Sequence, residues 1–216
     1  SAIYSNTLSS AFVFDDLAVV VLNPVIHSLD LVALWQAFNT RFVVGLSLAL
    51  NYALGKEDVL GYHAFNIFVH ILNAFLVYQL VCLTRKTPKF LAFFAALIFL
   101  THPIQTQAVS YVWQRSTSLA TLFYLGSLVF YVRGRLCRHP EAAKPPKDLD
   151  SSATAWPQND GGWNYVLSLV LAVLGMFTKE IVFTLPAAIL LYELCFLRSS
   201  DDKRSKTLLY VLPFIL

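Results

Sequence analysis

Long apolar runs alternate with short charged clusters along this sequence. A helix that crosses a bilayer takes about 20 mostly apolar residues, so such runs predict membrane-spanning helices. The expected spans are Tyr62–Leu83, Phe90–Thr101, Ser116–Val132, Trp163–Thr178 and Ile181–Leu197, followed by the beginning of another at Thr207–Leu216. The pattern therefore predicts an all-α integral membrane protein with a multi-span helical bundle.

Residues 1–61 have a different pattern. Leu29–Phe38 and Val43–Leu54 are helical in pattern but too short to span, so we expect interfacial helices within a long outer first loop. The run Phe90–Thr101 is also short, at about 18 Å of helix. It must either extend past His102 or stop inside the bilayer against protein, and either choice puts polar residues at membrane depth.

Composition supports lipid surroundings. Apolar residues make up 57% of the 216 residues and charged residues 13%, and the mean hydropathy is +0.61. These values lie outside the range of water-soluble proteins, and the net charge of +3 indicates no nucleic-acid partner. The sequence opens at Ser1 without Met and closes at Leu216 inside an apolar run, so we expect a fragment of a longer protein.

Lys and Arg gather at every second connection, which predicts the orientation. Three clusters lie within residues 85–89, 133–147 and 198–206, and such clusters mark the cytoplasmic side. Residues 1–61, the His102–Arg115 segment and the Lys179–Glu180 turn then lie on the outer face.

Residues 134–162 contain Pro, Ser and Gly in a pattern typical of a flexible cytoplasmic loop. This loop separates transmembrane residues 62–133 from transmembrane residues 163–216. The cysteines lie on the cytoplasmic side, where a reducing compartment predicts no disulfide; they are Cys82, Cys137 and Cys195.

Asp15 and Asp16 form an acidic pair in the outer loop. Adjacent carboxylates near a low-dielectric boundary repel each other and can keep one pKa raised, which suits a general base. The alternative is a helix N-cap or a turn before Leu17, and the pair alone favours that alternative.

A polar stripe follows one face of the Tyr62–Leu83 span. Its members fall within an arc of about 80° on an ideal helix; they are His63, Asn66, His70 and Asn73. This face must point into the bundle, either to make interhelical hydrogen bonds or to bind a ligand. No metal site is predicted, because His63 and His70 would need ligands from elsewhere.

His102 and Pro103 open a polar outer segment that ends at Arg115. Proline breaks the helix at this point. Arg115 enters the next span without a neighbouring acid, so it invites an anionic partner, either a carboxylate of the protein or a phosphate. An arginine that snorkels to lipid headgroups is an equal alternative.

Lys179 and Glu180 form a charged pair between two apolar runs. As a turn the pair needs no function, whereas as a buried pair it would be costly without one. Its predicted place on the same face as Asp15, Asp16 and Arg115 makes it a candidate for the site.

Several short motifs occur together in an order that resembles a known family. They are Phe14-Asp15-Asp16, Asn23-Pro24, Arg41 before Leu46–Asn51-Tyr52, Gly61-Tyr62-His63 with Asn66, His70 and Asn73, the run His102–Val109, Arg115, and Lys179-Glu180 before Thr184-Leu185-Pro186. This set resembles the membrane module of the transmembrane-and-tetratricopeptide-repeat proteins, a branch of the C-type (GT-C) glycosyltransferases related to protein O-mannosyltransferases. The likeness covers nearly the whole chain and looks closest to bacterial members.

The resemblance implies a multi-span glycosyltransferase on the outer leaflet that uses a polyprenyl-phosphate sugar as donor. It also implies a bacterial inner membrane with a periplasmic active face, and an active site that includes the Asp15-Asp16 pair. Family members carry tetratricopeptide repeats after the membrane module, and this sequence shows none.

We expect Asp15 or Asp16 to take the proton from an acceptor hydroxyl, on a Ser or Thr of an exported protein, as that hydroxyl attacks the anomeric carbon. Arg115, with Lys179 and His102, would stabilise the departing lipid phosphate. The expected supporting polar residues are His63, His70, Glu180 and Arg41. A single displacement needs no cofactor or metal and inverts the sugar.

Two rival functions belong to other classes. A non-catalytic scaffold of the same fold, within a larger membrane assembly, would have its site occluded by side chains or by a partner. A transporter would use the histidine stripe and Arg115 as a substrate path, but no inverted repeat supports it. A deep outer cavity that joins Asp15, Asp16 and Arg115 would favour the enzyme.

Overall fold

The computed structural model describes residues 2–84, 87–138, 161–197 and 212–214. Within these ranges every regular element is a helix, which confirms the predicted all-α fold. Three helical stretches are long and apolar enough to cross a membrane, namely Leu31–Gly55, Val59–Leu83 and Glu180–Leu197. A bent pair, Lys89–Thr101 with Pro103–Ser110, would make a fourth. The expected span at Thr207–Leu216 lies almost entirely outside the described residues.

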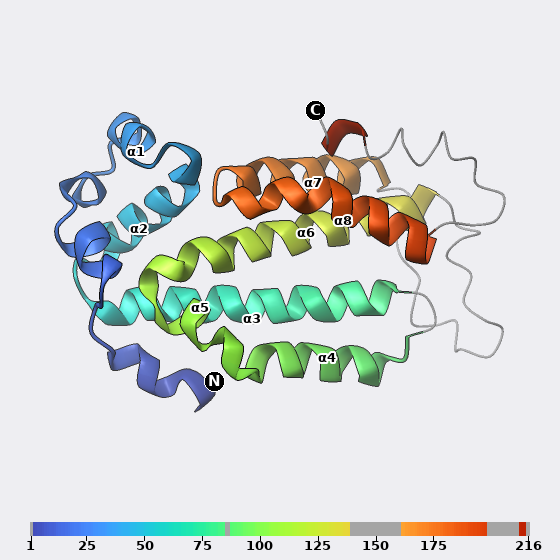
Figure 1. The fold of residues 1–216 in the computed structure, drawn as a ribbon, viewed down its shortest axis with the longest axis horizontal. Coiled ribbons are helices and arrows are strands. Elements are labelled where there is room, and N and C mark those ends of the chain that lie inside the picture. Colours follow the sequence, from blue (N-terminus) through green and yellow to red (C-terminus); the bar gives the residue numbers. More distant parts are fainter. Residues whose placement is uncertain (1, 85–86, 139–160, 198–211, 215–216) are drawn as a thin grey trace.

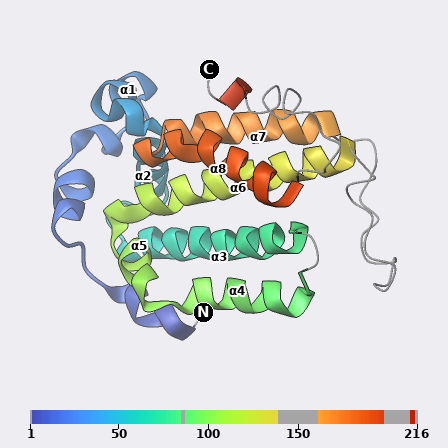
Figure 2. The same ribbon diagram turned by 45° about the vertical axis from the view of Figure 1, so that its right-hand side comes forward.

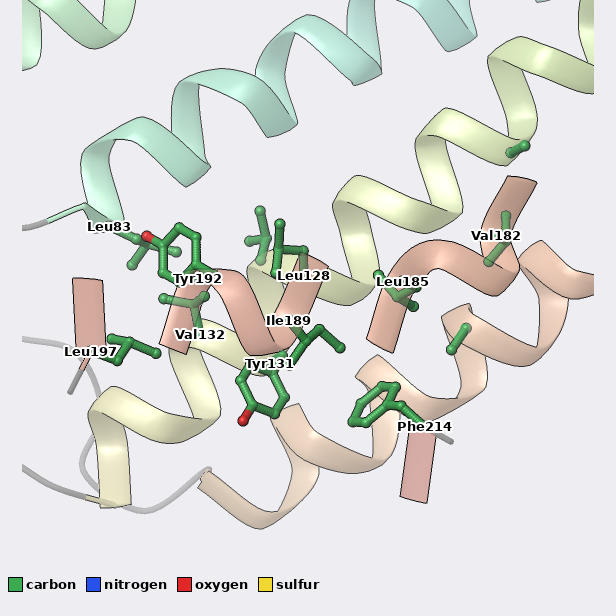
Figure 3. Packing of buried hydrophobic residues seen from close by; sticks show 13 residues of the cluster. Leu83, Leu128, Tyr131, Val132, Val182, Leu185, Ile189, Tyr192, Leu197 and Phe214 are labelled. Carbon is green, nitrogen blue, oxygen red and sulfur yellow. The ribbon is translucent and has the colours of Figure 1, made fainter. Parts of the chain in front are cut away.

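The longer helices form an elongated bundle (Figures 1 and 2). Its members are α3 (Val59–Leu83), α4 (Lys89–Thr101), α6 (Arg115–Arg138), α7 (Gly161–Met176) and α8 (Leu185–Tyr192). Helix α3 packs against both α4 and α6, and α6 packs against α7. Leu83, Leu128, Ile189 and Tyr192 belong to a buried apolar cluster that joins α3, α6 and α8 (Figure 3). This cluster runs along the bundle from Leu83 to Val182, which lies two residues after Glu180.

Two further helices, α1 (Leu31–Phe38) and α2 (Phe42–Gly55), lie together at one end of the bundle (Figure 1). Asp30 begins α1 by accepting the N–H groups of the next turn, and Asn39 ends it with a φ of 41°. The apolar stretch is therefore divided into two helices, close to the ranges that the sequence predicted. Their position relative to a membrane stays a prediction.

Helix α4 ends at Thr101 rather than continuing across the bilayer. His102 has an extended backbone (φ −65°, ψ 127°), as expected for a residue before proline. Pro103 then begins a short turn, and α5 (Thr106–Ser110) completes a segment inclined by 48° to α4. The predicted break at Pro103 is thus present, and it leaves irregular backbone beside α3.

Helix α6 extends beyond its expected span, whereas α7 begins and ends two residues earlier than expected. Residues 134–138, which we expected in the cytoplasmic loop, continue α6 to Arg138. Helix α7 begins at Gly161 and has 16 residues, so it is shorter than a usual crossing. Residues 139–160 of the predicted loop lie outside the described part of the chain.

A second buried cluster joins the N-terminal segment to the end of the bundle. It includes Val20, Leu34, Leu48, Tyr62 and Val112, each from a different helical element of the chain. Burial of such side chains contributes about 1.5–3 kcal/mol each. The cluster therefore fixes the segment that carries the acidic pair against the residues that precede α6.

Candidate functional site

The polar stripe of α3 contacts backbone oxygens of α4, of the segment between α4 and α6, of α6 itself and of the N-terminal segment. His63, Asn66, His70 and Asn73 are all buried, and each has a ring or amide nitrogen within 2.9–3.4 Å of a backbone oxygen. Those oxygens belong to Ser10, Leu100, Val109, Tyr111 and Ser118.

These contacts have a simple physical reason. For Leu100, Val109 and Tyr111, the break at Pro103 and the irregular backbone that follows it leave carbonyls without the intrahelical partners of a regular helix. The stripe supplies partners from a neighbouring helix. The structure therefore supports the interhelical hydrogen-bond interpretation of the stripe, and gives His63 and His70 supporting roles.

Arg115, the first residue of α6, is 0% exposed. Its Nε donates to Oδ1 of Asn66 at 2.9 Å, its Nη1 to the Ser47 carbonyl at 3.1 Å and its Nη2 to the Tyr62 carbonyl at 3.1 Å. The guanidinium carbon also lies 4.4 Å from the centre of the Phe65 ring. A buried arginine is tolerable when such dipoles and a ring face surround it.

This arrangement differs from both expectations for Arg115. The acceptors are one side-chain amide and two backbone carbonyls rather than an anion, and complete burial keeps the guanidinium from lipid headgroups. Arg115 ties the beginning of α6 to α2 and α3. Its position is structural, and it does not face a surface where a donor phosphate could reach it.

Asp16 is 1% exposed and holds a turn in place. Its Oδ1 accepts the N–H of Trp113 at 2.8 Å, and its Oδ2 accepts the N–H groups of Val112 and Val13, each at 3.4 Å. Burial raises the pKa of the carboxyl, and the three N–H groups oppose that rise. The side chain makes no cap on the helical turn that begins at Leu17, so Asp16 is not an N-cap. It does hold a turn before Leu17, which was the other form of that alternative.

Asp15 is exposed, unlike its neighbour. Its backbone N–H donates to Oη of Tyr111 at 3.1 Å, while its carboxylate stays accessible. The structure therefore divides the acidic pair into one buried carboxylate that positions the chain and one exposed carboxylate that a ligand can reach.

Three further charged residues, Arg41, Lys179 and Glu180, contact residues at or just before the beginning of α6, or one another. Arg41 forms an ion pair with Glu180 at 3.3 Å, and its guanidinium carbon lies 5.9 Å from the centre of the Trp113 ring. Lys179 donates from Nζ to Oγ1 of Thr117 at 2.7 Å. Lys179 and Glu180 thus have separate partners, and neither forms the costly buried pair that was one possibility.

Trp113 connects the two charged groups. Its backbone N–H contacts the Asp16 carboxylate, and its ring lies beside the Arg41 guanidinium. Arg41 and Glu180 remain partly exposed, at 35% and 56% of their side chains. The site therefore offers an exposed carboxylate at Asp15 and a partly exposed cation at Arg41, and Trp113 contacts both Asp16 and Arg41.

His102 is not brought into this group by any recorded contact. Its side chain is exposed, and Nδ1 accepts the N–H of Ile104 at 3.2 Å, which caps the turn that begins at Pro103.

A hollow of about 460 Å³ lies between the N-terminal segment and α3. Tyr4 and Leu8 are among its lining residues, and none of the lining residues is a predicted site residue. Among the described residues, no three His, Cys, Asp or Glu side chains are grouped to hold a metal ion.

Comparison with known proteins shows relatives of one kind. The chain is 28% identical over 217 residues to human protein O-mannosyl-transferase TMTC1, which covers 94% of this chain and 23% of that protein. It is 31% identical over 150 residues to protein O-mannosyl-transferase F38B6.6 of Caenorhabditis elegans, covering 61% of this chain and 21% of that protein. The chain is also 30% identical over 149 residues to human protein O-mannosyl-transferase TMTC3, which covers 62% of this chain and 16% of that protein.

The chain is homologous to these protein O-mannosyl-transferases. It spans about a fifth of the length of these curated relatives. No protein-family model matches the chain, and no solved structure matches it. The relatives named here are animal proteins, so closeness to bacterial members stays a prediction.

Sequence reasoning missed Trp113 and Tyr111 as parts of the candidate site. Trp113 contributes mainly through its backbone N–H, and any residue type carries that group. Tyr111 lay within the polar outer segment but had no sequence signal that joined it to Asp15. The pairing of Arg41 with Glu180 had only the opposite charges of the two residues as a signal.

Proposed function

We propose that this chain forms part of the membrane module of a GT-C-type glycosyltransferase. It would transfer a sugar from a polyprenyl-phosphate donor to a Ser or Thr hydroxyl of a protein acceptor on the outer face of the membrane. The names of the homologous proteins support mannose as the sugar and protein as the acceptor. The observation that carries the proposal is the division of the acidic pair, which leaves Asp15 accessible while Asp16 anchors its turn.

Asp15 is the better general base of the two carboxylates. Both oxygens of Asp16 already accept backbone N–H groups, so a proton from an acceptor would have to compete with them. An exposed carboxylate can meet an acceptor hydroxyl directly, which is the geometric requirement for a general base. Asp16 is accordingly a positioning residue in this scheme.

The reaction is a single displacement at the anomeric carbon. The acceptor oxygen forms a bond to that carbon, the bond from the carbon to the phosphate oxygen breaks, and the phosphate leaves with the electron pair. Asp15 takes the hydroxyl proton and later releases it to water. One displacement inverts the anomeric centre, and the side chains named here supply the base without an enzyme nucleophile.

Arg41 and Lys179 are the cations that we assign to the donor phosphate. Both are accessible, and positive groups near a departing phosphate stabilise its developing charge. Arg41 has the planar fork that can contact two phosphate oxygens, and Glu180 holds that fork in place. Arg115 is left out because its guanidinium is fully engaged inside the bundle.

A non-catalytic scaffold of the same fold is the second candidate function. The burial of Arg115 is the observation that favours it, because one group of the expected cavity is occluded by side chains. Transfer activity separates the two functions directly.

The broad test uses a labelled membrane lipid extract as donor and total exported protein as acceptor. Membranes from an intact strain should transfer label, and membranes from a strain that lacks the gene should not. Equal transfer by both membranes would favour the scaffold. We also propose a bacterial inner membrane with a periplasmic active face, and tetratricopeptide repeats elsewhere in the protein. The orientation rests on the charge clusters, and the bacterial membrane and the repeats rest on the resemblance.

A further inference from the structure

Phe14, directly before Asp15, has an unusual backbone and an unusual exposure. Its φ is 49°, in the left-handed region that residues other than glycine seldom occupy. Its side chain is 85% exposed, so burial of the ring does not compensate for this conformation. Backbone strain of this kind persists only where surrounding contacts impose it.

Contacts on both sides of Phe14 impose the conformation. Before it, the N–H of Val13 donates to Oδ2 of Asp16, whose carboxylate is itself fixed by Trp113. After it, the N–H of Asp15 donates to Oη of Tyr111. The turn therefore presents the Phe14 ring outward, next to the accessible carboxylate.

Apolar side chains continue around this carboxylate. Val13 is 45% exposed and Leu17 is 46% exposed, so Val13, Phe14 and Leu17 form an exposed apolar rim on both sides of Asp15 in the sequence. Insertion of this rim into hydrocarbon would carry the Asp15 carboxylate with it, which is costly. The rim is therefore better suited to a ligand that approaches Asp15 from the aqueous side.

We propose that Phe14 is an acceptor-binding residue that contacts an apolar side chain next to the acceptor Ser or Thr of a polypeptide. This inference rests on the proposed function, because the base acts on the acceptor hydroxyl and the groups that flank the base meet the acceptor first. The donor phosphate instead requires cations, which lie at Arg41 and Lys179. Aromatic side chains, Phe among them, are enriched in the cores of polypeptide interfaces.

Phe14→Gly is the sharpest test of this role. Glycine removes the ring and also suits the positive φ, so the thermal unfolding temperature should stay unchanged or rise. With a Ser or Thr peptide flanked by Leu or Val, the variant should raise KM about tenfold or more, with a much smaller change in kcat. A matched peptide flanked by Gly should show little change, and Phe14→Tyr should restore the wild-type KM.

Peptide binding without donor gives a second measurement. The dissociation constant of the Leu-flanked peptide should rise by the same factor in Phe14→Gly when both proteins also carry Asp15→Asn, which prevents transfer. Leu22→Ala is the matched control, since Leu22 is 74% exposed in the same segment but outside the rim, and it should leave binding and transfer unchanged.

The outcomes separate the two proposals. Absence of transfer by the wild-type protein would overturn the proposed function. Wild-type transfer together with an unchanged KM and dissociation constant in Phe14→Gly would overturn the role of Phe14 and leave the proposed function standing. An equal rise of KM for both peptides would also overturn it, because the ring would then not recognise the apolar neighbour.

Discussion

The backbone N–H of Trp113 donates to Oδ1 of Asp16 over 2.8 Å, and the two residues lie 97 positions apart in the sequence. The Trp113 ring also lies beside Arg41. This one residue therefore links the acidic turn of the outer loop to Arg41, one of the two cations assigned to the donor phosphate. The chemistry proposed for Asp15 depends on that link, because Asp16 determines where the turn sits.

The first prediction concerns the stability contributed by Asp16. Burial raises the pKa of its carboxyl, so the folded protein binds the proton more tightly than the unfolded chain. This contribution to stability is fully present below the ordinary Asp pKa of about 4 and is lost as the pH rises through the higher folded-state pKa. The wild type should therefore lose stability relative to Asp16→Asn as the pH rises.

Thermal unfolding in detergent over a pH series measures this difference, and other carboxylates cancel because both proteins contain them. Asn lacks one of the two acceptor oxygens, which shifts the difference by a constant amount at every pH. A wild type that gained stability relative to Asp16→Asn with rising pH would show a lowered pKa instead and would contradict the prediction.

The second prediction concerns Arg115. Arg115→Ala would leave Oδ1 of Asn66 without its donor, at a cost of about 1–3 kcal/mol, would remove one donor from the helical carbonyls of Ser47 and Tyr62, and would leave a cavity in the bundle. We expect the free energy of unfolding to fall by about 3 kcal/mol or more. Arg115→Lys should also be destabilised, because one ammonium group cannot serve three acceptors spaced for a guanidinium fork.

Affinity for a polyprenyl-phosphate sugar, measured on the folded fraction in lipid nanodiscs, should stay unchanged in both Arg115 variants. Lys56→Ala, an exposed cation at the end of α2, serves as the control for surface charge. Weakened donor binding without a loss of stability would contradict this prediction and would indicate that Arg115 binds the donor phosphate.

Much of the fold could be predicted from local patterns. The apolar run of α3 and its polar stripe predicted both the helix and the face that turns into the bundle, because a polar face in a membrane bundle must be shielded from lipid. Pro103 predicted the break after α4, since proline cannot continue the hydrogen-bond ladder. These features depend on residue type and spacing, which the sequence shows directly.

The candidate site could be predicted only in part. Asp15 and Asp16 are identical in type and adjacent, but only Asp16 is buried, where it accepts the distant N–H groups of Trp113 and Val112. Arg115 has two backbone carbonyls among its acceptors, and a backbone carbonyl is present at every residue. Such partners have no sequence signal, so the burial of Arg115 became visible only in three dimensions.

The third prediction concerns Arg41 as a phosphate-binding residue. Arg41→Lys keeps the charge but removes the fork, so donor affinity in nanodiscs should fall several-fold, and Arg41→Ala should lower it further. Because Arg41 and Glu180 form an exposed pair, stability should change by no more than about 1 kcal/mol. Equal donor affinity in the wild type and both variants would remove Arg41 from the donor site.

The fourth prediction concerns orientation. In a protein whose native cysteines are replaced by serine, a cysteine at Thr106 should react with an impermeant thiol reagent added outside sealed cells, while a cysteine at Ser151 should not. The clusters of Lys and Arg require this arrangement. Labelling of Ser151→Cys from outside would reverse the orientation and remove the basis for an outer-face reaction.

The most direct test of the central claim measures transfer of labelled sugar from a polyprenyl-phosphate donor to a Ser or Thr peptide, using purified wild type, Asp15→Asn and the exposed control Glu57→Gln. Because Asp15→Asn keeps nearly the same volume and removes only the base, the rate should fall about a hundredfold or more, with an unchanged unfolding temperature. Glu57→Gln should transfer at the wild-type rate. Transfer by Asp15→Asn at that same rate would contradict the role of Asp15, and no transfer by the wild type would contradict the enzyme.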